Sequence, residues 1–368
     1  MNKDKRSSLV RLIAFFLVAL ILVCTFGFTA DGWNMNDKVV SGQNKDNKPT
    51  LPDNGVDSGE NQPSAPENKP PEFLNPLTGL ETTEELSQQR PQAFLMNPDS
   101  PLYGSSFSEI LVEIPVENGK TRLMAIMSDT SNLWKLGSLS PTRAYISNVA
   151  KFFGASIISL GKDESIQYNS CDASKDTLDL SLNKEHYYSE YTYYTYTNAN
   201  LLNTAFSSSD IEMQISKEVK LPFIHNDYFA NEIENSNIAK NISVIYSSAS
   251  ITEFIFSEER GTYILQKNGV ACKDLLTNTN HEFKNCFILF ADSVTYEGVN
   301  GEQTVINTIG EGSGFYFTNG SCTKIKWESD ADGTLRFLNT EGSTLTINRG
   351  TSYVAYVKSS RTDSVIYE

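Results

Sequence analysis

The stretch Ile110-Leu-Val-Glu-Ile-Pro-Val-Glu-Asn-Gly-Lys-Thr-Arg-Leu-Met-Ala-Ile-Met127 predicts a β-hairpin that organises the first part of the folded chain. Two apolar runs, 110–116 and 121–127, flank Asn118-Gly119. This dipeptide favours a two-residue turn because both of its residues readily adopt positive φ. We therefore expect the two runs to be antiparallel neighbours in a sheet.

Helices and strands alternate around this hairpin. Buried strands are predicted at 93–96 and 155–160 from their short apolar runs. A short helix is expected over 81–89, with Thr82 or Thr83 as its N-cap, and a longer helix over 140–153. The interleaved order predicts a mixed α/β domain over 73–206.

The rest of the chain has the pattern of an antiparallel β domain over 236–358, after a connector over 207–235 and before a tail over 359–368. Turn signals recur at Asn268-Gly269, Asn300-Gly301, Asn319-Gly320 and Asp332-Gly333, and a further hairpin is expected across Asn348-Arg-Gly350. Ile325 and Trp327 should face inward. Gly310-Glu-Gly-Ser-Gly314 lacks a following Lys-Ser/Thr, so it predicts a glycine-rich turn into a strand. The predicted fold class is α+β.

The N-terminal segment 1–30 contains an uncharged, apolar run from Leu12 to Ala30 behind a basic cluster. At about 1.5 Å per residue this run would extend roughly 28 Å, close to the thickness of a bilayer core. Three interpretations remain: an uncleaved transmembrane anchor, a lipoprotein signal ending at Cys24, or a secretory signal cleaved near Gly27. The length favours the anchor, and Val23 is a poor residue before a lipidated cysteine.

Residues 31–72 are polar and have one aromatic residue, Trp33. Such a segment cannot bury enough apolar surface to offset its conformational entropy, so we expect a disordered tether. As a flexible coil its ends would lie roughly 35 Å apart on average. The folded part would then stand clear of the membrane, in the extracytoplasmic space.

The composition restricts the possible partners and cofactors. The chain has 368 residues and a net charge of −15, which argues against nucleic acid because phosphate backbones require a basic surface. Beyond Cys24, the cysteines are Cys171, Cys272, Cys286 and Cys322. They allow three disulfide pairings, of which Cys272–Cys286 would close a short loop, but small buried thiols are an equal alternative. Without a C-x-x-C motif, neither a metal nor a cofactor is expected.

Tyrosines crowd the stretch from His186 to Tyr196. They could form an aromatic platform that stacks on sugar rings. The favoured interpretation is a strand and turn whose rings pack the domain, because tyrosine suits strands and no acidic cluster accompanies the run.

Four charged residues of the first region attract interest. Glu113 and Glu117 would lie about 13 Å apart on a strand, too far for a glycosidase pair. One is expected at a solvated edge and the other paired with Arg122 across the hairpin. Arg143 begins a predicted helix, where a cation opposes the dipole, so it should have a carboxylate partner or an anionic ligand.

At these residues the chain resembles the YerB-like family of bacterial cell-surface lipoproteins, which are built from a two-part domain of unknown function. The resemblance spans 73–358. Its motifs are Asn75-Pro-Leu-Thr-Gly79, Arg90-Pro91, Glu113-(x3)-Glu117, Thr121-Arg122-Leu-Met-Ala125, Gly137-(x5)-Arg143, Leu221-Pro-Phe, Gly312-x-Gly314, Asn319-Gly320, Trp327 and Gly342-(x5)-Asn348-x-Gly350. It implies a two-domain envelope protein, often lipid-anchored, without an assigned reaction.

The chain also departs from the family pattern at three places. Ser140 stands where the family has an arginine, Ser159-Leu160-Gly161 replaces a His-His-Gly motif, and Thr195–Asn198 lacks a Pro-His-Asn motif. The resemblance thus implies a diverged member that has lost titratable groups, and this loss favours binding over catalysis.

The sequence as a whole predicts a membrane-tethered extracytoplasmic binding or scaffolding protein of the cell envelope. Its partners would be the membrane, through residues 12–30, and a cell-wall polymer or an envelope-synthesis protein. Ligand-binding candidates are Arg143, Arg122, Glu113, Glu117 and Gly161, and no catalytic residue is assigned. The alternatives are an enzyme acting on cell-wall glycan or peptide near Arg143, and a structural spacer.

Overall fold

The computed structural model describes residues 69–161, 176–191, 193–216, 218–230, 232–233, 235, 237–298 and 301–368. In this part of the chain most of the regular structure is β, and helices are few. None of the helices there is long and apolar enough to cross a bilayer. The predicted membrane segment 12–30, with Cys24, and the tether up to residue 68 lie outside the described residues, as does Cys171.

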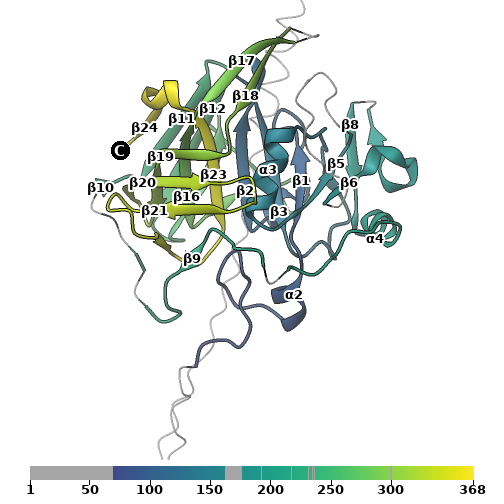
Figure 1. The fold of residues 1–368 in the computed structure, drawn as a ribbon, viewed down its shortest axis with the longest axis horizontal. Coiled ribbons are helices and arrows are strands. Elements are labelled where there is room, and N and C mark those ends of the chain that lie inside the picture. Colours follow the sequence, from purple (N-terminus) through teal and green to yellow (C-terminus); the bar gives the residue numbers. More distant parts are fainter. Residues whose placement is uncertain are drawn as a thin grey trace, which may run out of the picture. The chain divides into compact units, whose positions relative to one another are not determined.

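A central sheet of eleven strands crosses the folded unit (Figure 1). Its order is β10-β20-β19-β16-β23-β2-β3-β1-β5-β6, with β21 paired to β20. The strands are β1 (Gln92–Met96), β2 (Ile110–Pro115), β3 (Thr121–Met127), β5 (Ser156–Ser159), β6 (Thr177–Asp179), β10 (Asn237–Ile238), β16 (Asn285–Ala291), β19 (Gly310–Thr318), β20 (Ser321–Ser329), β21 (Leu335–Leu338) and β23 (Ser352–Lys358).

Strand β23 joins the two sequence regions into this one sheet. It lies between β16 and β2 and runs parallel to both. The hairpin predicted across Asn348-Arg-Gly350 is therefore wrong, because β22 (Thr346–Ile347) pairs instead with β9 (Ile224–His225). Six of the seven residues of β23 are buried, the pattern of a strand covered on both faces.

One face of the central sheet packs against a second, six-stranded sheet. Alternate residues of the central strands, such as Leu111, Ala125 and Tyr353, meet Phe254 and Leu265 of this sheet in one hydrophobic core. Its strands are β11 (Asn241–Ser247), β12 (Ser250–Ser257), β13 (Thr262–Lys267), β14 (Val270–Ala271), β15 (Glu282–Phe283) and β24 (Val365–Tyr367).

The opposite face is covered in part by helix α3 (Ala144–Phe152) (Figure 1). Val112 and Ile126 of the central sheet pack there with Ile146 and Val149 of the helix, in a second core. Trp327 lies in the same core. Successive residues of one strand therefore point alternately into two separate cores. Charged side chains of a strand can form an ion pair only with groups on the same side of the sheet.

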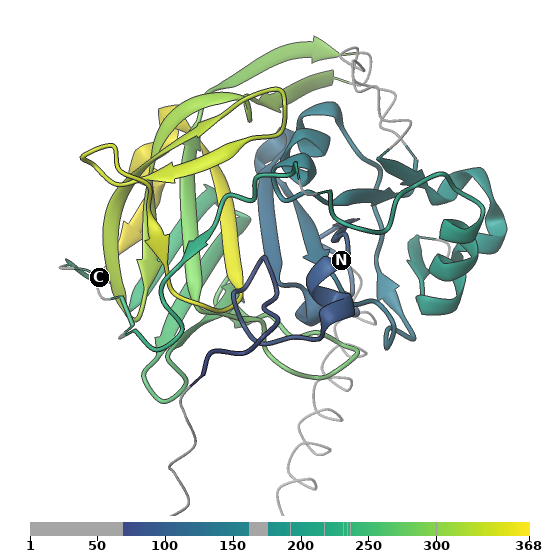
Figure 2. The same ribbon diagram turned by 60° about the horizontal axis from the view of Figure 1, so that its bottom comes forward.

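The remaining elements lie around these layers. The ribbon of β17 (Ser293–Gly298) and β18 (Gly301–Ile306) projects from the central sheet (Figure 2). The other elements are β4 (Leu136–Gly137), β7 (Tyr188–Glu190), β8 (Tyr194–Thr197), α2 (Glu84–Gln88), α4 (Ala199–Ser207) and the 3-10 turns η1 (Ser105–Phe107), η2 (Glu117–Gly119), η3 (Leu180–Leu182), η4 (Lys184–His186) and η5 (Ser359–Ser364).

Several local predictions are confirmed. β2 and β3 pair antiparallel, and Asn118 and Gly119 at their turn have φ of 59° and 66°. Thr83 caps α2 through a bond from the Leu86 N–H. Ile325 and Trp327 are buried. The expected helix over 140–153 begins later, at Ala144.

The glycine-rich run 310–314 is part of strand β19 rather than a turn before it. A Cβ at Gly312 would lie 2.3 Å from the Phe290 carbonyl oxygen, and one at Gly314 would lie 2.5 Å from that of Ile288. Glycine is needed because β16 approaches too closely for any side chain.

Cys272, Cys286 and Cys322 are free thiols, so the Cys272–Cys286 pairing is wrong. Cys286 and Cys322 are buried in the core, as the alternative interpretation expected.

Candidate functional site

Arg143 and Glu117 form a two-pronged ion pair between the start of α3 and the tip of the β2–β3 hairpin. The guanidinium nitrogens lie 2.6 and 2.7 Å from the two carboxylate oxygens, and Arg143 is buried. Burial opposes the charged guanidinium, but hydrogen bonds to Glu117 and Tyr145 outweigh it and raise the pKa of Arg143. The prediction of a carboxylate partner for Arg143 is confirmed.

The hairpin tip itself rests on strand β11 of the second sheet. The Ser247 hydroxyl donates to the Gly119 carbonyl at 3.1 Å. A Cβ at Gly119 would lie 2.5 Å from that of Ser247, so this contact requires glycine as well as the turn geometry. The tip is thus held from one side by Arg143 and from the other by β11.

Beside the tip is a cavity of about 440 Å³ at the end of the space between the two sheets. The hairpin contributes Pro115, Val116 and residues 118–120 to its walls. Residues 245–248 of β11 and its following turn form another wall, and Val357, Lys358, Arg361 and Ser364 complete it. Both sequence regions therefore build this cavity, and ligand sites commonly occur at such junctions.

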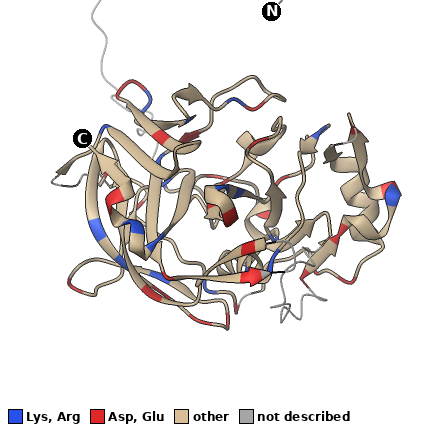
Figure 3. Cartoon of the chain, turned by 90° about the horizontal axis from the view of Figure 1, so that it is seen from above, with Lys and Arg blue, Asp and Glu red and all other residues tan. Residues whose placement is uncertain are grey.

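The cavity has three cationic side chains, Lys120, Lys358 and Arg361, and no carboxylate among its lining residues. Elsewhere along the chain, acidic and basic residues are interspersed (Figure 3). Glu117 follows the lining residue Val116, yet it is absent from the cavity wall because its carboxylate is bound to Arg143. The cavity is accordingly suited to an anion.

Glu113 lies on the other face of β2 from Arg143, and it is completely buried. Its carboxylate accepts hydrogen bonds from Thr121, Thr252 and Tyr353 at 2.6 to 2.7 Å and is paired with Lys267. Burial raises the pKa of Glu113, but the charge and hydrogen bond of Lys267 outweigh it, so the net pKa is lowered.

The expectation for Glu113 is wrong, because Glu113 is neither a solvated edge residue nor the partner of Arg122: it is completely buried and pairs with Lys267. Glu117 pairs with Arg143. Arg122 lies on the face of β3 that also carries Met124, and its charge acts on Tyr145. Arg122, Arg143 and Glu117 are thus grouped on the α3 face, while Glu113 belongs to the interior between the sheets.

Gly161 lies close to Arg143 through the backbone, since its carbonyl accepts the N–H of Thr142 at 3.1 Å. Its own N–H donates to Asp179. The three segments that depart from the family pattern are neighbours in the structure. The Leu160 N–H donates to the Ser140 carbonyl, and the Leu139 N–H donates to the Thr195 carbonyl. The side chains of these segments include hydroxyls, and the buried Ser159 hydroxyl has no hydrogen-bond partner among the residues that the structure describes.

The tyrosine-rich stretch is partly packed and partly exposed. Tyr196 is buried, and the Lys135 ammonium lies 4.0 Å from its ring centroid and 3.9 Å from that of Tyr103. Lys135 also pairs with Glu190 at 2.7 Å. The packing interpretation holds for Tyr196, whereas Tyr191 and Tyr193 are more than four-fifths exposed.

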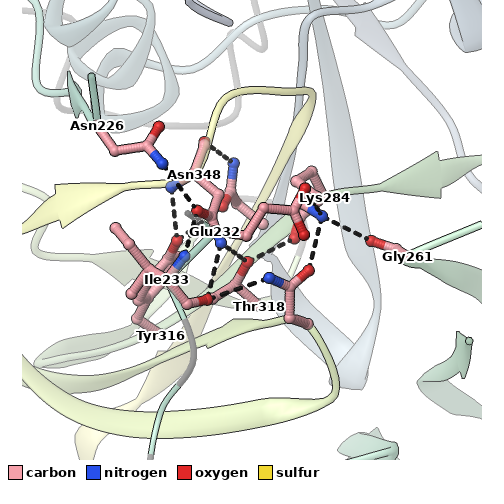
Figure 4. Close-up of polar contacts among 10 residues, drawn as sticks. Asn226, Glu232, Ile233, Gly261, Lys284, Tyr316, Thr318 and Asn348 are labelled. Carbon is pink, nitrogen blue, oxygen red and sulfur yellow. Dashed lines mark hydrogen bonds and ion pairs between the residues drawn. The ribbon is translucent and has the colours of Figure 1, made fainter. Parts of the chain in front are cut away.

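A second polar cluster, around Asn348, holds the connector between the two regions (Figure 4). The Asn348 amide donates to the Ile233 carbonyl and the Thr318 hydroxyl, both at 2.9 Å, and accepts the Ile233 N–H at 2.7 Å. Lys284 beside it binds Glu232 and the Asn319 side chain. These bonds fasten the connector at residues 232–233 to strand β19 and to the segment around Asn348, so this cluster serves the fold.

Sequence reasoning missed the residues Lys358 and Arg361 as well as Lys267. Lys358 ends a buried apolar strand and Arg361 follows it, which is only a weak signal. Arg361 lies in the predicted tail 359–368. Lys267 is 154 residues from Glu113, and only the folded sheet pairs them. Within the part of the chain that the structure covers, no group of three His, Cys, Asp or Glu residues could hold a metal ion.

Comparison with known proteins identifies the family. One family model, for the N-terminal domain of the proteins of unknown function DUF3048, matches residues 77–219, and the model for their C-terminal domain matches 242–354. The chain belongs to the DUF3048 family. The resemblance inferred from the sequence motifs is confirmed.

A sequence match and a structural match, both to the YerB protein of Bacillus subtilis, agree with this assignment. The YerB protein of Bacillus subtilis (strain 168), whose curated name classes it provisionally as a lipoprotein, is 23% identical over 268 residues; the match covers 69% of this chain and 77% of the relative. A crystal structure of the YerB protein from Bacillus subtilis has a TM-score of 0.69 at 19% identity, and the match covers 80% of this chain and 99% of that one. At this identity the structural likeness shows the fold alone.

Proposed function

We propose that this DUF3048 protein is a membrane-tethered, extracytoplasmic binding protein of the bacterial cell envelope, and that the cavity at the hairpin tip receives its ligand. The name of the YerB relative supports a membrane association. The apolar segment 12–30 of this chain would attach it to the membrane, and residues 31–72 would be the flexible tether that holds the folded part away from the bilayer.

The observation that carries the proposal is the construction of the cavity. It is lined from the hairpin, from β11 and from the chain after β23, and it combines three cations with no carboxylate on a chain of net charge −15. A chance surface hollow on so acidic a chain would be expected to include acidic side chains. This cavity instead has the charge that a binding site for an anionic envelope component requires.

Photocrosslinking in intact cells tests this proposal. A photoreactive phenylalanine analogue at Ser248, an exposed residue that lines the cavity, should capture an envelope component. The matched control is Ser343, which is also exposed and does not line the cavity. Equal capture at both positions, or none at Ser248, would overturn the assignment of the site.

A further inference from the structure

We infer that the group recognised in this cavity is a phosphate ester, held by Lys120, Lys358 and Arg361, whose uncharged organic part rests on the apolar wall. This inference rests on the proposed function and names the chemical class of its ligand. Phosphate esters occur both on lipids and on soluble molecules, and the two sources share this chemistry.

The number of cations favours a phosphate over a carboxylate. A carboxylate carries one negative charge, so it would leave two of the three cations without a counter-charge in the cavity. A phosphomonoester carries −1.5 to −2 charges at neutral pH and offers three strong acceptor oxygens, one for each cationic side chain. Arginine adds a planar fork of donors that fits phosphate.

These three cations come from different elements and remain available to a ligand. Lys120 has an ion pair at 3.5 Å to Asp99, but both side chains are more than three-fifths exposed, so water screens this pair. Within the described residues, the one polar partner of the Lys358 ammonium is the Thr304 hydroxyl, at 3.4 Å. Arg361 lies in η5, next to the lining residue Ser364.

The inner wall explains why the ligand should have an organic part. Pro115, Val116, Ile245 and Val357 also line the cavity. Val357 belongs to the core between the two sheets, so part of the cavity wall is continuous with this core. Inorganic phosphate would leave that wall in contact with water, whereas an alkyl group would cover it at roughly 25 cal/mol per Å² of buried apolar surface.

Titration of the full-length protein in detergent micelles tests the inference. The probes are hexyl phosphate, hexanoate and inorganic phosphate, with binding measured by calorimetry. Hexyl phosphate should bind most tightly, and its affinity should rise between pH 5 and 7.5 as its second proton, with a pKa of about 6, dissociates. Lys358→Gln and Arg361→Gln should each weaken binding about fivefold, roughly the effect of one exposed charge pair.

The control variant is Lys326→Gln, which removes an exposed lysine that does not line the cavity. It should leave the affinity unchanged. Equal affinity for hexyl phosphate and hexanoate, or an equal effect of all three substitutions, would overturn the phosphate assignment. If Ser248 still captures an envelope component in cells, the proposed function survives that failure.

The two sources of the phosphate are separated by competition against bound hexyl phosphate. Dihexanoyl phosphatidic acid displaces it more strongly if the site takes a lipid headgroup. Glycerol 3-phosphate displaces it equally well if the site takes a soluble phosphoester. Displacement by neither compound would count against the inference.

Discussion

Both carboxylate oxygens of Glu117 are held by the guanidinium of Arg143, at 2.6 and 2.7 Å. Glu117 lies between the lining residues Val116 and Asn118, and the pair holds its carboxylate at the start of α3. Arg143 therefore acts on the cavity as a positioning residue: it is buried and already bound to Glu117, rather than exposed to a ligand.

Arg143→Ala should weaken hexyl phosphate binding because it releases Glu117 beside the three cations. It should also lower the free energy of unfolding by roughly 1–3 kcal/mol, since one partner of a partly buried pair is lost. Calorimetric titration and urea unfolding measure the two effects.

The double variant Arg143→Ala/Glu117→Gln separates positioning from direct contact. It should recover most of the lost affinity, since the released charge is then absent. Affinity that stays as low as in the single variant would mean that Arg143 contacts the ligand itself.

Glu113→Gln should remove a pH dependence of stability at low pH. Because the folded pKa of Glu113 lies below its ordinary value of 4.5, its carboxylate stabilises the folded state above that pH, and this contribution is lost as pH falls through the folded pKa. Urea unfolding between pH 5 and 3 should therefore show a steeper loss for the wild type than for the variant. Parallel curves would contradict the role assigned to the Glu113–Lys267 pair.

Glu109 should give the stability a pH dependence of the opposite sign to that of Glu113. Burial raises its pKa to about 7, although the Ser128 N–H and the Asn75 amide donate to its carboxylate. The folded state therefore retains a proton that the unfolded state loses near pH 4.5, and stability falls as pH rises from about 4.5 to 7. Glu109→Gln should flatten this fall, by up to about 3 kcal/mol, in unfolding experiments over that range.

Asn348→Ala should destabilise the fold and loosen the connector. It leaves the Ile233 N–H without its side-chain acceptor, which costs roughly 1–3 kcal/mol for an unsatisfied buried group. The Ile233 carbonyl loses the Asn348 amide but keeps the Asn319 amide at 3.2 Å. Urea unfolding and limited proteolysis near residues 226–235 should report both changes. Asn339→Ala is the control, because the Asn339 side chain serves only an exposed turn, and it should change neither.

The sequence allowed local elements to be predicted where one short segment contains the whole signal. The hairpin at Asn118-Gly119, the cap at Thr83 and the inward Trp327 are of this kind. Pairings between distant segments could not be predicted. Nothing in the stretch around Glu113 indicates Lys267, and nothing in 352–358 indicates that it lies between β16 and β2.

In the candidate site, too, pairings between segments distant in sequence could not be predicted. A partner for Arg143 followed from the unfavourable position of a cation at a helix start, and Glu117 was already under consideration. The cavity, however, depends on three segments that are more than 100 residues apart in sequence. Of its cations, Arg361 lies in the stretch 359–368 predicted to be a tail, and Lys358 lies directly before that stretch.

The parallel placement of β23 between the two regions has a consequence for how the chain is made. A chain emerging from its N-terminus can pair β2 with β3 early, but the other edge of β2 stays open until residues 352–358 have been synthesised. An open apolar edge recruits strands from other chains. The first 219 residues expressed alone should therefore aggregate, and the native protein can complete its sheet only after residues 352–358 have been made.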